Sequence, residues 1–248
     1  MLSRSIIILF CFVSSFSNAQ FDGKGDKEPS RFRPGIMWFY SGISPAEEEN
    51  PAKYDRLIFD ITYNDWVGAR DVFSNHWASI GLNTNVMFDI PMIKGNKFSF
   101  GIGISHQYTN VRHDNKLVIN DSLGTTVFMP KDASDNFFKS VLSGNSFSIP
   151  IEFRFRNESW KQFKFHLGGK IGYQANLLSK QVAHIDGYKT TTKRSGFQDD
   201  NQFIYSVHMR IGIRNWALFG SYNLNTLFSN SKSSQLNLVQ MGLSLSLF

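Results

Sequence analysis

The sequence predicts an all-β protein, an eight-stranded antiparallel up-and-down transmembrane β-barrel with an N-terminal periplasmic segment. Two observations predict it: eight segments alternate large apolar side chains with small or polar ones, and the connections between them alternate in length. A two-residue period is typical of a strand, and a tilted strand of about 9–11 residues crosses a bilayer. The predicted strands span residues 57–64, 78–90, 98–109, 146–156, 163–176, 203–214, 216–225 and 236–247.

The segment 146–156 indicates which face points outward. Its large residues are Phe147, Ile149, Ile151, Phe153 and Phe155, and the positions between them carry serine, proline, glutamate or arginine. Because the interior of an eight-stranded barrel is only just wide enough to be filled by side chains, so bulky a face must point outward to lipid. The opposite face is rich in glycine and serine and lines a narrow polar lumen. The same volume argument disfavours a soluble barrel with an apolar lumen.

Aromatic residues concentrate near the ends of the predicted strands, as in the two interfacial girdles of membrane barrels. Those beside the long connections are Tyr63, Trp66, Trp77, Tyr108, Phe147, Tyr173, Phe203 and Tyr205. Those beside the short turns are Phe88, Phe98, Phe155, Phe163 and Trp216. The alternative is a β-sandwich in which these aromatic rings form the core.

The connections predict the orientation of the barrel. Short turns at 91–97, 157–161 and Asn215 alternate with long connections at 65–77, 110–145, 177–202 and 226–235. A barrel with both termini in the periplasm has short inner turns and long outer loops. In the second long connection, two extended pieces, 116–120 and 125–129, predict a hairpin above the barrel, and Ser134 to Leu142 predict a helical turn.

The chain divides into three predicted parts. Residues 1–19 resemble a secretory signal, with Arg4, an apolar stretch and a small-residue cleavage site ending at Ala19. Residues 20–53 form the periplasmic segment, because a ninth strand would put the termini on opposite sides of the membrane. Residues 54–248 form the barrel. Cys11 lies in the signal, so the mature chain has no thiol for a disulfide, a nucleophile or a metal.

The charge balance and the pattern of residues exclude several classes of protein. Without Arg4, 25 of the 26 basic residues remain against 20 acidic ones, a mild excess without the clustered aromatics of a nucleic-acid site. No mature stretch approaches the roughly 18 apolar residues of a spanning helix. We expect outer-membrane localisation, contact with outer-membrane lipid and lipopolysaccharide, no nucleic-acid partner and no cofactor.

Seven charged or titratable residues occupy lumen-facing positions near the middle of the predicted strands: Asp60, Asp89, Glu152, Arg154, Lys170, His208 and Arg210. An unpaired charge in so narrow a space costs several kcal/mol, so we expect a paired, hydrogen-bonded network. The network is either a plug that fills the lumen or the gate of a small-ion path. Pro150 has no ladder donor and predicts a local bulge.

The histidines near the rim are the candidates for an outer-membrane hydrolase. They are His76, His106, His113 and His184, with Asp71, Asp114 and Asp186 nearby in the sequence. None has the setting of an activated nucleophile, and none has metal-ligand spacing. His106, next to a predicted aromatic girdle, fits an interfacial histidine. We therefore expect no enzymatic activity, and a rim hydrolase is the least favoured function.

Two strands carry a family resemblance. Phe147-Ser148-Ile149-Pro150-Ile151-Glu152-Phe153-Arg154-Phe155, followed by the glycine-rich Leu167–Tyr173, resembles the small outer-membrane barrels of Bacteroidota often labelled PorT-like. The resemblance covers roughly residues 54–248. It implies an outer-membrane barrel inserted by the barrel assembly machinery, and loosely an association with secretion or motility.

The function predicted from the sequence is that of a non-enzymatic anchor or accessory of an envelope machine, acting through its loops or its N-terminal segment. Trp38, Phe39 and Tyr40 form an aromatic cluster that either packs at the barrel mouth or docks a periplasmic or envelope partner. A narrow gated channel for small solutes is the alternative.

Overall fold

The computed structural model describes residues 55–68, 75–93, 97–132, 135–157, 163–185 and 188–247. The predicted signal, the segment 20–53 and the cluster of Trp38, Phe39 and Tyr40 lie outside the described residues. No helix within the described ranges is long and apolar enough to cross a membrane.

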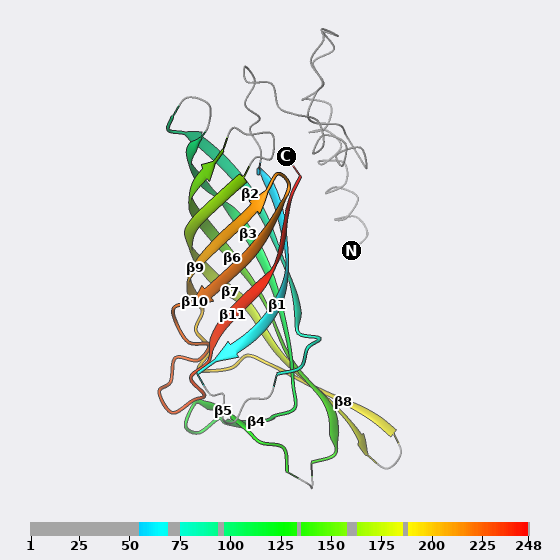
Figure 1. Ribbon diagram of the computed structural model, residues 1–248. Helices are drawn as coiled ribbons and strands as arrows, with labels where there is room; N and C mark the ends of the chain where they lie inside the picture. The colour runs from blue at the N-terminus through cyan, green and yellow to red at the C-terminus, as the bar shows by residue number, and fades with distance from the viewer. Residues whose placement is uncertain are drawn as a thin grey trace, which may run out of the picture.

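Eight antiparallel strands close into a barrel, as the alternation predicts (Figure 1). In order around the wall they are β1 (Leu57–Val67), β2 (Ile80–Pro91), β3 (Phe98–His113), β6 (Phe137–Arg156), β7 (Phe163–Ile185), β9 (Phe203–Ile213), β10 (Trp216–Asn223) and β11 (Asn237–Ser246). β11 pairs with β1, and the pairing of β6 with β7 leaves no free edge in the wall.

Three further strands lie at the loop end of the barrel. β4 (Lys116–Asn120) and β5 (Thr125–Met129) form the predicted hairpin, which pairs only with itself. β8 (Tyr188–Ser195) pairs with the last residues of β7, and together they project from the barrel as an arm (Figure 1).

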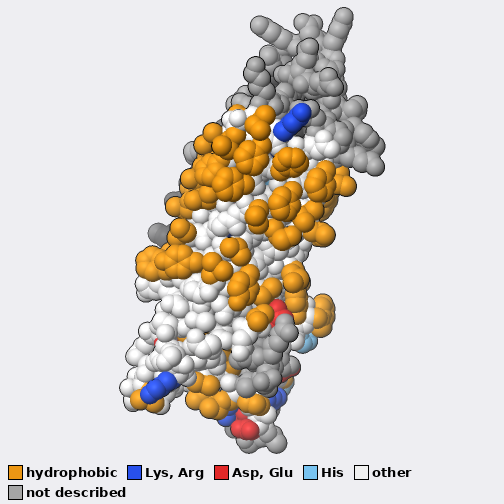
Figure 2. All heavy atoms as spheres, turned by 60° about the vertical axis from the view of Figure 1, so that its left-hand side comes forward, with side chains coloured by type: hydrophobic (Ala, Val, Ile, Leu, Met, Phe, Trp, Pro, Cys, Tyr) orange, Lys and Arg blue, Asp and Glu red, His pale blue; other side chains and the backbone are white. Residues whose placement is uncertain are grey.

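The two faces of the barrel wall are apolar outside and polar inside, as the sequence predicts. The large apolar side chains point outward, and Ile61, Ile104 and Leu218 are each more than 60% exposed. On the side of the molecule seen in Figure 2, hydrophobic side chains gather over the barrel wall and become sparser below it, before the loop end. In contrast, Asp60 and Arg210 are fully buried in the lumen. A continuous apolar outer surface around a polar interior is the arrangement of a barrel that spans a lipid bilayer.

The aromatic girdles are also present, with one correction. Tyr108, Phe147 and Phe203 are exposed toward the loop end, and Phe88 and Trp216 are exposed toward the turn end. Trp66 was predicted to join the girdle, but it is only 6% exposed. β1 continues to Val67, so Trp66 keeps the inward direction of Asp60 and Asn64.

The predicted helical turn from Ser134 to Leu142 is wrong. β6 already begins at Phe137, and its first half pairs with the end of β3 on one side and with β7 on the other. β3 and β7 both extend beyond the predicted strands, and their backbone N–H and C=O groups face this segment. The segment therefore satisfies its backbone hydrogen bonds as a strand between them rather than within a helical turn.

The bulge predicted at Pro150 is also wrong. Pro150 pairs in register with Lys170 of β7, and the irregularities of this ladder lie at Phe137/Lys139 and Asn145/Ser146. On the β3 side, the ladder passes from Ile102↔Ile151 to Ser105↔Ser148 without a change of register. Pairing with β3 is therefore interrupted beside Pro150, which has no N–H to donate. The residue pairs on either side keep the strand in register.

The outward direction of Ile151 and Ile171 gives a test of the lipid face. Arginine at either position places a charge in hydrocarbon and should destabilise the barrel by about 2–4 kcal/mol in lipid, measured by reversible unfolding. Thr190→Arg, on the exposed arm, is the matched control and should change little. Spin labels at 151 and 171 should report a lipid environment, and water exposure there would contradict the assignment.

Candidate functional site

The turn-end half of the lumen is filled by charged side chains. Four carboxylates, those of Asp55, Asp60, Asp89 and Glu152, lie among five cations within the described part of the chain. The cations are Arg154, Arg156, Lys164, Lys170 and Arg210.

Glu152 on β6 is the centre of this charged layer. Its carboxylate accepts hydrogen bonds from Arg154 Nε at 2.8 Å and from an Arg210 guanidinium nitrogen, and His208 Nε2 lies 2.8 Å from it. All four side chains are essentially inaccessible to solvent. Removal of this carboxylate would leave the positive charges of Arg154 and Arg210 less well neutralised. Both groups are buried, so water cannot take the place of the carboxylate.

Each of these arginines also binds a second carboxylate. Arg210 donates to both oxygens of Asp60, at 3.1 and 2.8 Å, in the bidentate geometry that makes arginine pairs strong. Arg154 forms an ion pair with Asp89. The carboxylate of Asp60 is further bound by the Asn85 amide at 2.9 Å. These contacts join β1, β2, β6 and β9 across the lumen.

Asp55 forms a second centre nearer the turn end. It lies just before β1 with a positive φ of 71°, and its carboxylate binds Arg156 at 3.0 Å and Lys164 at 2.6 Å. Lys164 also donates to Ser246 Oγ at 2.8 Å. The segment that enters the first strand is thereby joined to β6, β7 and the end of β11.

Glycines leave the space that these long side chains occupy. A Cβ at Gly101 would lie 2.7 Å from Arg154 Nε, and one at Gly168 would lie 2.9 Å from Glu152 Cγ. The small residues of the lumen face are therefore opposite the large charged ones, and the interior is filled rather than open.

Six of the seven lumen residues predicted from the sequence join this network: Asp60, Asp89, Glu152, Arg154, His208 and Arg210. Lys170 is buried beside it without an ion pair or a hydrogen bond to a described residue, and its Nζ lies 5.3 Å from the centre of the Phe219 ring. Sequence reasoning missed Asp55, Lys164 and His166, and it placed Arg156 on the polar face without including it in the network. Lys164 and His166 share the strand parity of Lys170, so the alternation alone contained the signal for them.

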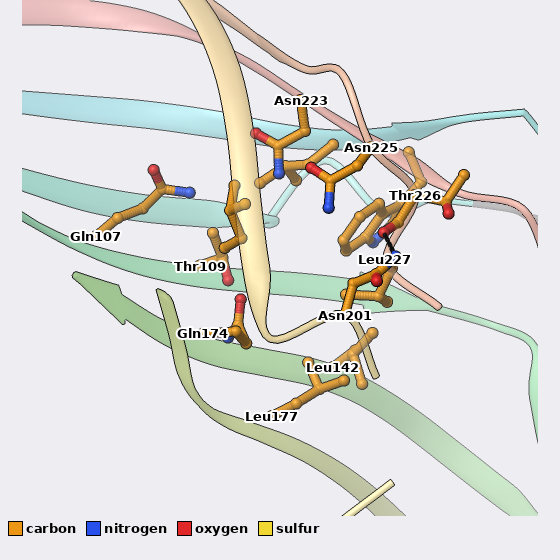
Figure 3. A pocket seen from close by; sticks show the side chains of 13 residues that line it. Gln107, Thr109, Leu142, Gln174, Leu177, Asn201, Asn223, Asn225, Thr226 and Leu227 are labelled. Carbon is orange, nitrogen blue, oxygen red and sulfur yellow. Dashed lines mark hydrogen bonds between the residues drawn. The ribbon is translucent and has the colours of Figure 1, made fainter. Parts of the chain in front are cut away.

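A layer of amides and hydroxyls follows toward the loop end. Gln240 donates to Asn64 Oδ1 at 2.8 Å and to Thr62 Oγ1 at 3.3 Å, and Asn83 donates to Gln240. Above this layer lies a small hollow, lined by polar residues such as Gln107 and by apolar ones including Leu177 (Figure 3). The hollow has room for one or two water molecules.

The loops close over this hollow with an apolar core of their own, which we call the cap core. It consists of Trp66, Val111, Phe128, Leu142, Leu177, Phe197, Phe228, Leu236 and Leu238. These residues come from β1, β3, β5, β6, β7, β11 and the loops beside β9 and β10. The predicted hairpin therefore folds onto the barrel mouth, and Phe128 packs beneath it against Phe228.

Asp199 fastens the hairpin to the cap. Its carboxylate accepts hydrogen bonds from the Thr126 backbone N–H at 3.0 Å, from Thr126 Oγ1 at 2.7 Å and from Ser233 Oγ. The side chains of Asp199, Thr126 and Ser233 are buried. Three loops that are far apart in sequence thus meet at one carboxylate.

The rim histidines have different surroundings, although the backbone of His76 pairs beside His113 at the end of β3. His106 points outward and packs on Phe147, and His184 stacks on Phe138 at 4.8 Å between ring centres. His76 is exposed beside Trp77. Asp71 and Asp186 lie outside the described residues.

His113 has a serine partner but the wrong tautomer for a general base. Its Nδ1 accepts the Asn115 N–H at 3.3 Å, so Nε2 carries the proton and donates it to Ser140 Oγ at 3.3 Å. Both side chains are buried. Among the same residues, no group of histidines, cysteines and carboxylates could hold a metal ion.

Comparisons with known proteins give matches among solved structures. No family model and no curated protein matches this chain. Among solved structures, the chain is similar to Ail, the attachment invasion locus protein of Yersinia pestis, at 11% identity and a TM-score of 0.29. The match covers 77% of this chain and 94% of that one. The assignment of the fold rests on the closed ladder and the outward apolar face of this chain.

The Glu152 centre predicts how the plug responds to loss of one charge. Glu152→Gln keeps the size of the side chain and removes its charge, so it should destabilise the barrel by about 3 kcal/mol, because Arg154 retains Asp89 and Arg210 retains Asp60. Thermal unfolding should shift downward, and single-channel recordings should show more leakage. Asp121→Asn, which breaks the exposed pair with Arg194, is the control. Unchanged melting without conductance would refute the role of the network.

The Asp199 contacts predict that the cap can be loosened separately from the barrel. Asp199→Ala removes hydrogen bonds worth about 1.5–3 kcal/mol each and should speed tryptic cleavage at Lys116 and Lys131. The heat-dependent gel shift of the folded barrel should remain. Asp200→Ala changes the neighbouring carboxylate, which has no comparable contacts among the described residues, and should leave the cleavage rate as in the wild type. Equal cleavage of both variants would contradict the anchoring role.

Proposed function

We propose that the protein is a non-conducting outer-membrane barrel that serves as an anchor or accessory of an envelope machine and displays a folded cap outside the cell. The observation that supports this most is the filled lumen: buried ion pairs occupy its turn-end half, and the cap core covers the other end. A barrel closed in both places has its accessible chemistry on the loops and the terminal segment.

The outer surface supports the proposed location. Apolar strands bounded by aromatic girdles suit a bilayer, and closed barrels of this kind belong to outer membranes. The short turns and the end of β11 lie together at one end of the wall (Figure 1). With the short turns toward the periplasm, the cap and the arm are outside the cell.

A narrow gated channel is the second candidate function. The buried Lys170, without a hydrogen bond to the described residues, and the small hollow above the amide layer are the two observations that favour it. The charged layer would have to open for ions to pass. Planar-bilayer recording of the wild-type protein separates the two proposals, since the anchor predicts a silent trace and the channel predicts discrete steps.

The accessory role is tested through the predicted N-terminal segment. Deletion of residues 20–50 removes no described strand, so the barrel should still insert and show its heat-dependent gel shift. Substitution of Trp38, Phe39 and Tyr40 by Ser should abolish cross-links to envelope proteins while the melting temperature stays the same, because loss of aromatic anchors weakens docking. If the triple variant unfolds the barrel instead, the cluster belongs to its core and the docking proposal fails.

A further inference from the structure

The loop-end extension of β3, β6, β7 and β8 has an outward face made of cations. The register of the four strands places Arg112, Lys139, Lys180, Lys189 and Lys193 on this face, which we call the cationic face. Arg112 and Lys180 both lie beside Val141, and Lys139 lies beside Val182. Lys193 is the partner of Lys180 on β8. The cationic face therefore crosses the whole width of the extension.

No described acidic residue occupies an outward position on this extension, and none of the five cations forms an ion pair with a described residue. The buried Nε of Arg112 also has no hydrogen-bond partner among these residues. The positive charge of Arg112, burial, and the charges of Lys180 and Lys189 together lower the pKa of Lys139. Like charges are thus held together without compensation inside the described chain, which is the condition that a bound anion relieves.

The position of the cationic face relative to the membrane indicates where that anion comes from. On β3, the outward row runs from Ile102 and Ile104 through His106 and the girdle residue Tyr108 to Arg112. Four residues at about 3.4 Å each, reduced by strand tilt, put Arg112 about 10 Å beyond the girdle. The headgroup layer begins at the girdle and is about 5–8 Å deep, and the long arginine side chain can reach back to its outer edge. The same row of side chains therefore passes from hydrocarbon to girdle to headgroup level.

We propose that the cationic face binds the phosphate groups of the lipid leaflet around the loop end, which is lipopolysaccharide in an outer membrane. The proposal rests on the proposed outer-membrane location and adds a defined lipid site to it. Charge complementarity supports it, since clustered lysines and arginines next to a bilayer bind anionic headgroups. So does geometry, because the face continues the lipid-facing side of the wall, whereas the opposite side of β6 carries Leu142 of the cap core.

The test uses a pair of labelling sites on β8 that differ only in face. Thr191 points to the same side as Lys189 and Lys193, and Thr192 points to the other side; both are exposed. Cys11 is the one cysteine of the chain, so Thr191→Cys and Thr192→Cys in the mature protein each carry a single fluorophore. Titration of the detergent-solubilised barrel with purified lipopolysaccharide should change the fluorescence at 191 much more than at 192. Equal responses at both positions would overturn the assigned face.

Neutralisation of lysines on the cationic face tests whether positive charge is what binds the phosphate groups. Each neutralised lysine should weaken binding roughly fivefold, so Lys139→Gln with Lys180→Gln should raise the Kd about 25-fold. The matched control, Arg194→Gln with Lys232→Gln, removes two cations from the loop end outside this face and should stay within about twofold. Added salt or dephosphorylated lipopolysaccharide should reduce wild-type binding similarly. Equal losses in both double variants would overturn the proposal.

A soluble polyanion distinguishes the lipid from other sources of phosphate. If inorganic polyphosphate binds the wild-type face as tightly as lipopolysaccharide does, the lipid assignment is overturned. The heat-dependent gel shift of each variant reports folding, and membrane fractionation of the wild-type protein reports the outer-membrane location. A folded barrel found in the outer membrane that does not bind lipopolysaccharide would therefore refute this inference alone.

Discussion

Glu152 lies between two arginines in the middle of the barrel, and the arrangement of the lumen follows from that contact. A carboxylate and two guanidinium groups removed from water require partners within a few ångströms, and these come from β1, β2, β6 and β9. These four strands must therefore keep a fixed register relative to one another. Glycine at 101 and 168 is part of the same requirement, because a Cβ at 101 would collide with Arg154 and one at 168 with the Ile151 backbone and the Glu152 side chain.

The protein has two interiors that are stabilised by different forces. The barrel interior is ionic and polar, and its wall is held by the closed ladder and the surrounding lipid. The cap core is apolar and is built from loops that converge over the mouth. One buried carboxylate, Asp199, joins these loops through hydrogen bonds to Thr126 and Ser233. The wall strands β1, β3, β6, β7 and β11 contribute to the cap core, whereas the hairpin and the loops beside β9 and β10 join it from outside the wall. Loss of the Asp199 contacts is therefore expected to loosen these loops before the wall.

The extension of β6 and β7 continues the membrane wall beyond the aromatic girdle at the loop end without a break in the strands. Along one row, the outward side chains change from aliphatic to aromatic to cationic, the order that the proposed lipid site requires. The arm formed by β7 and β8 carries this last section away from the barrel. A continuous sheet holds the charged groups at a fixed height, which separate flexible loops would not do.

The sequence by itself determined the strands, their faces and most of the lumen charges, because side chains alternate along any strand and a narrow barrel admits bulk only on its outside. It also located the hairpin of β4 and β5, whose turn is local. Only the tertiary structure decided the length of β6 and β7, since residues 137–145 become a strand when two neighbours extend beside them. It also decided the inward position of Asp55, which depends on cations about 100 residues away, and the meeting of Thr126 with Asp199. Such contacts join residues that no local period relates, so they follow from closure of the barrel rather than from any segment of the chain.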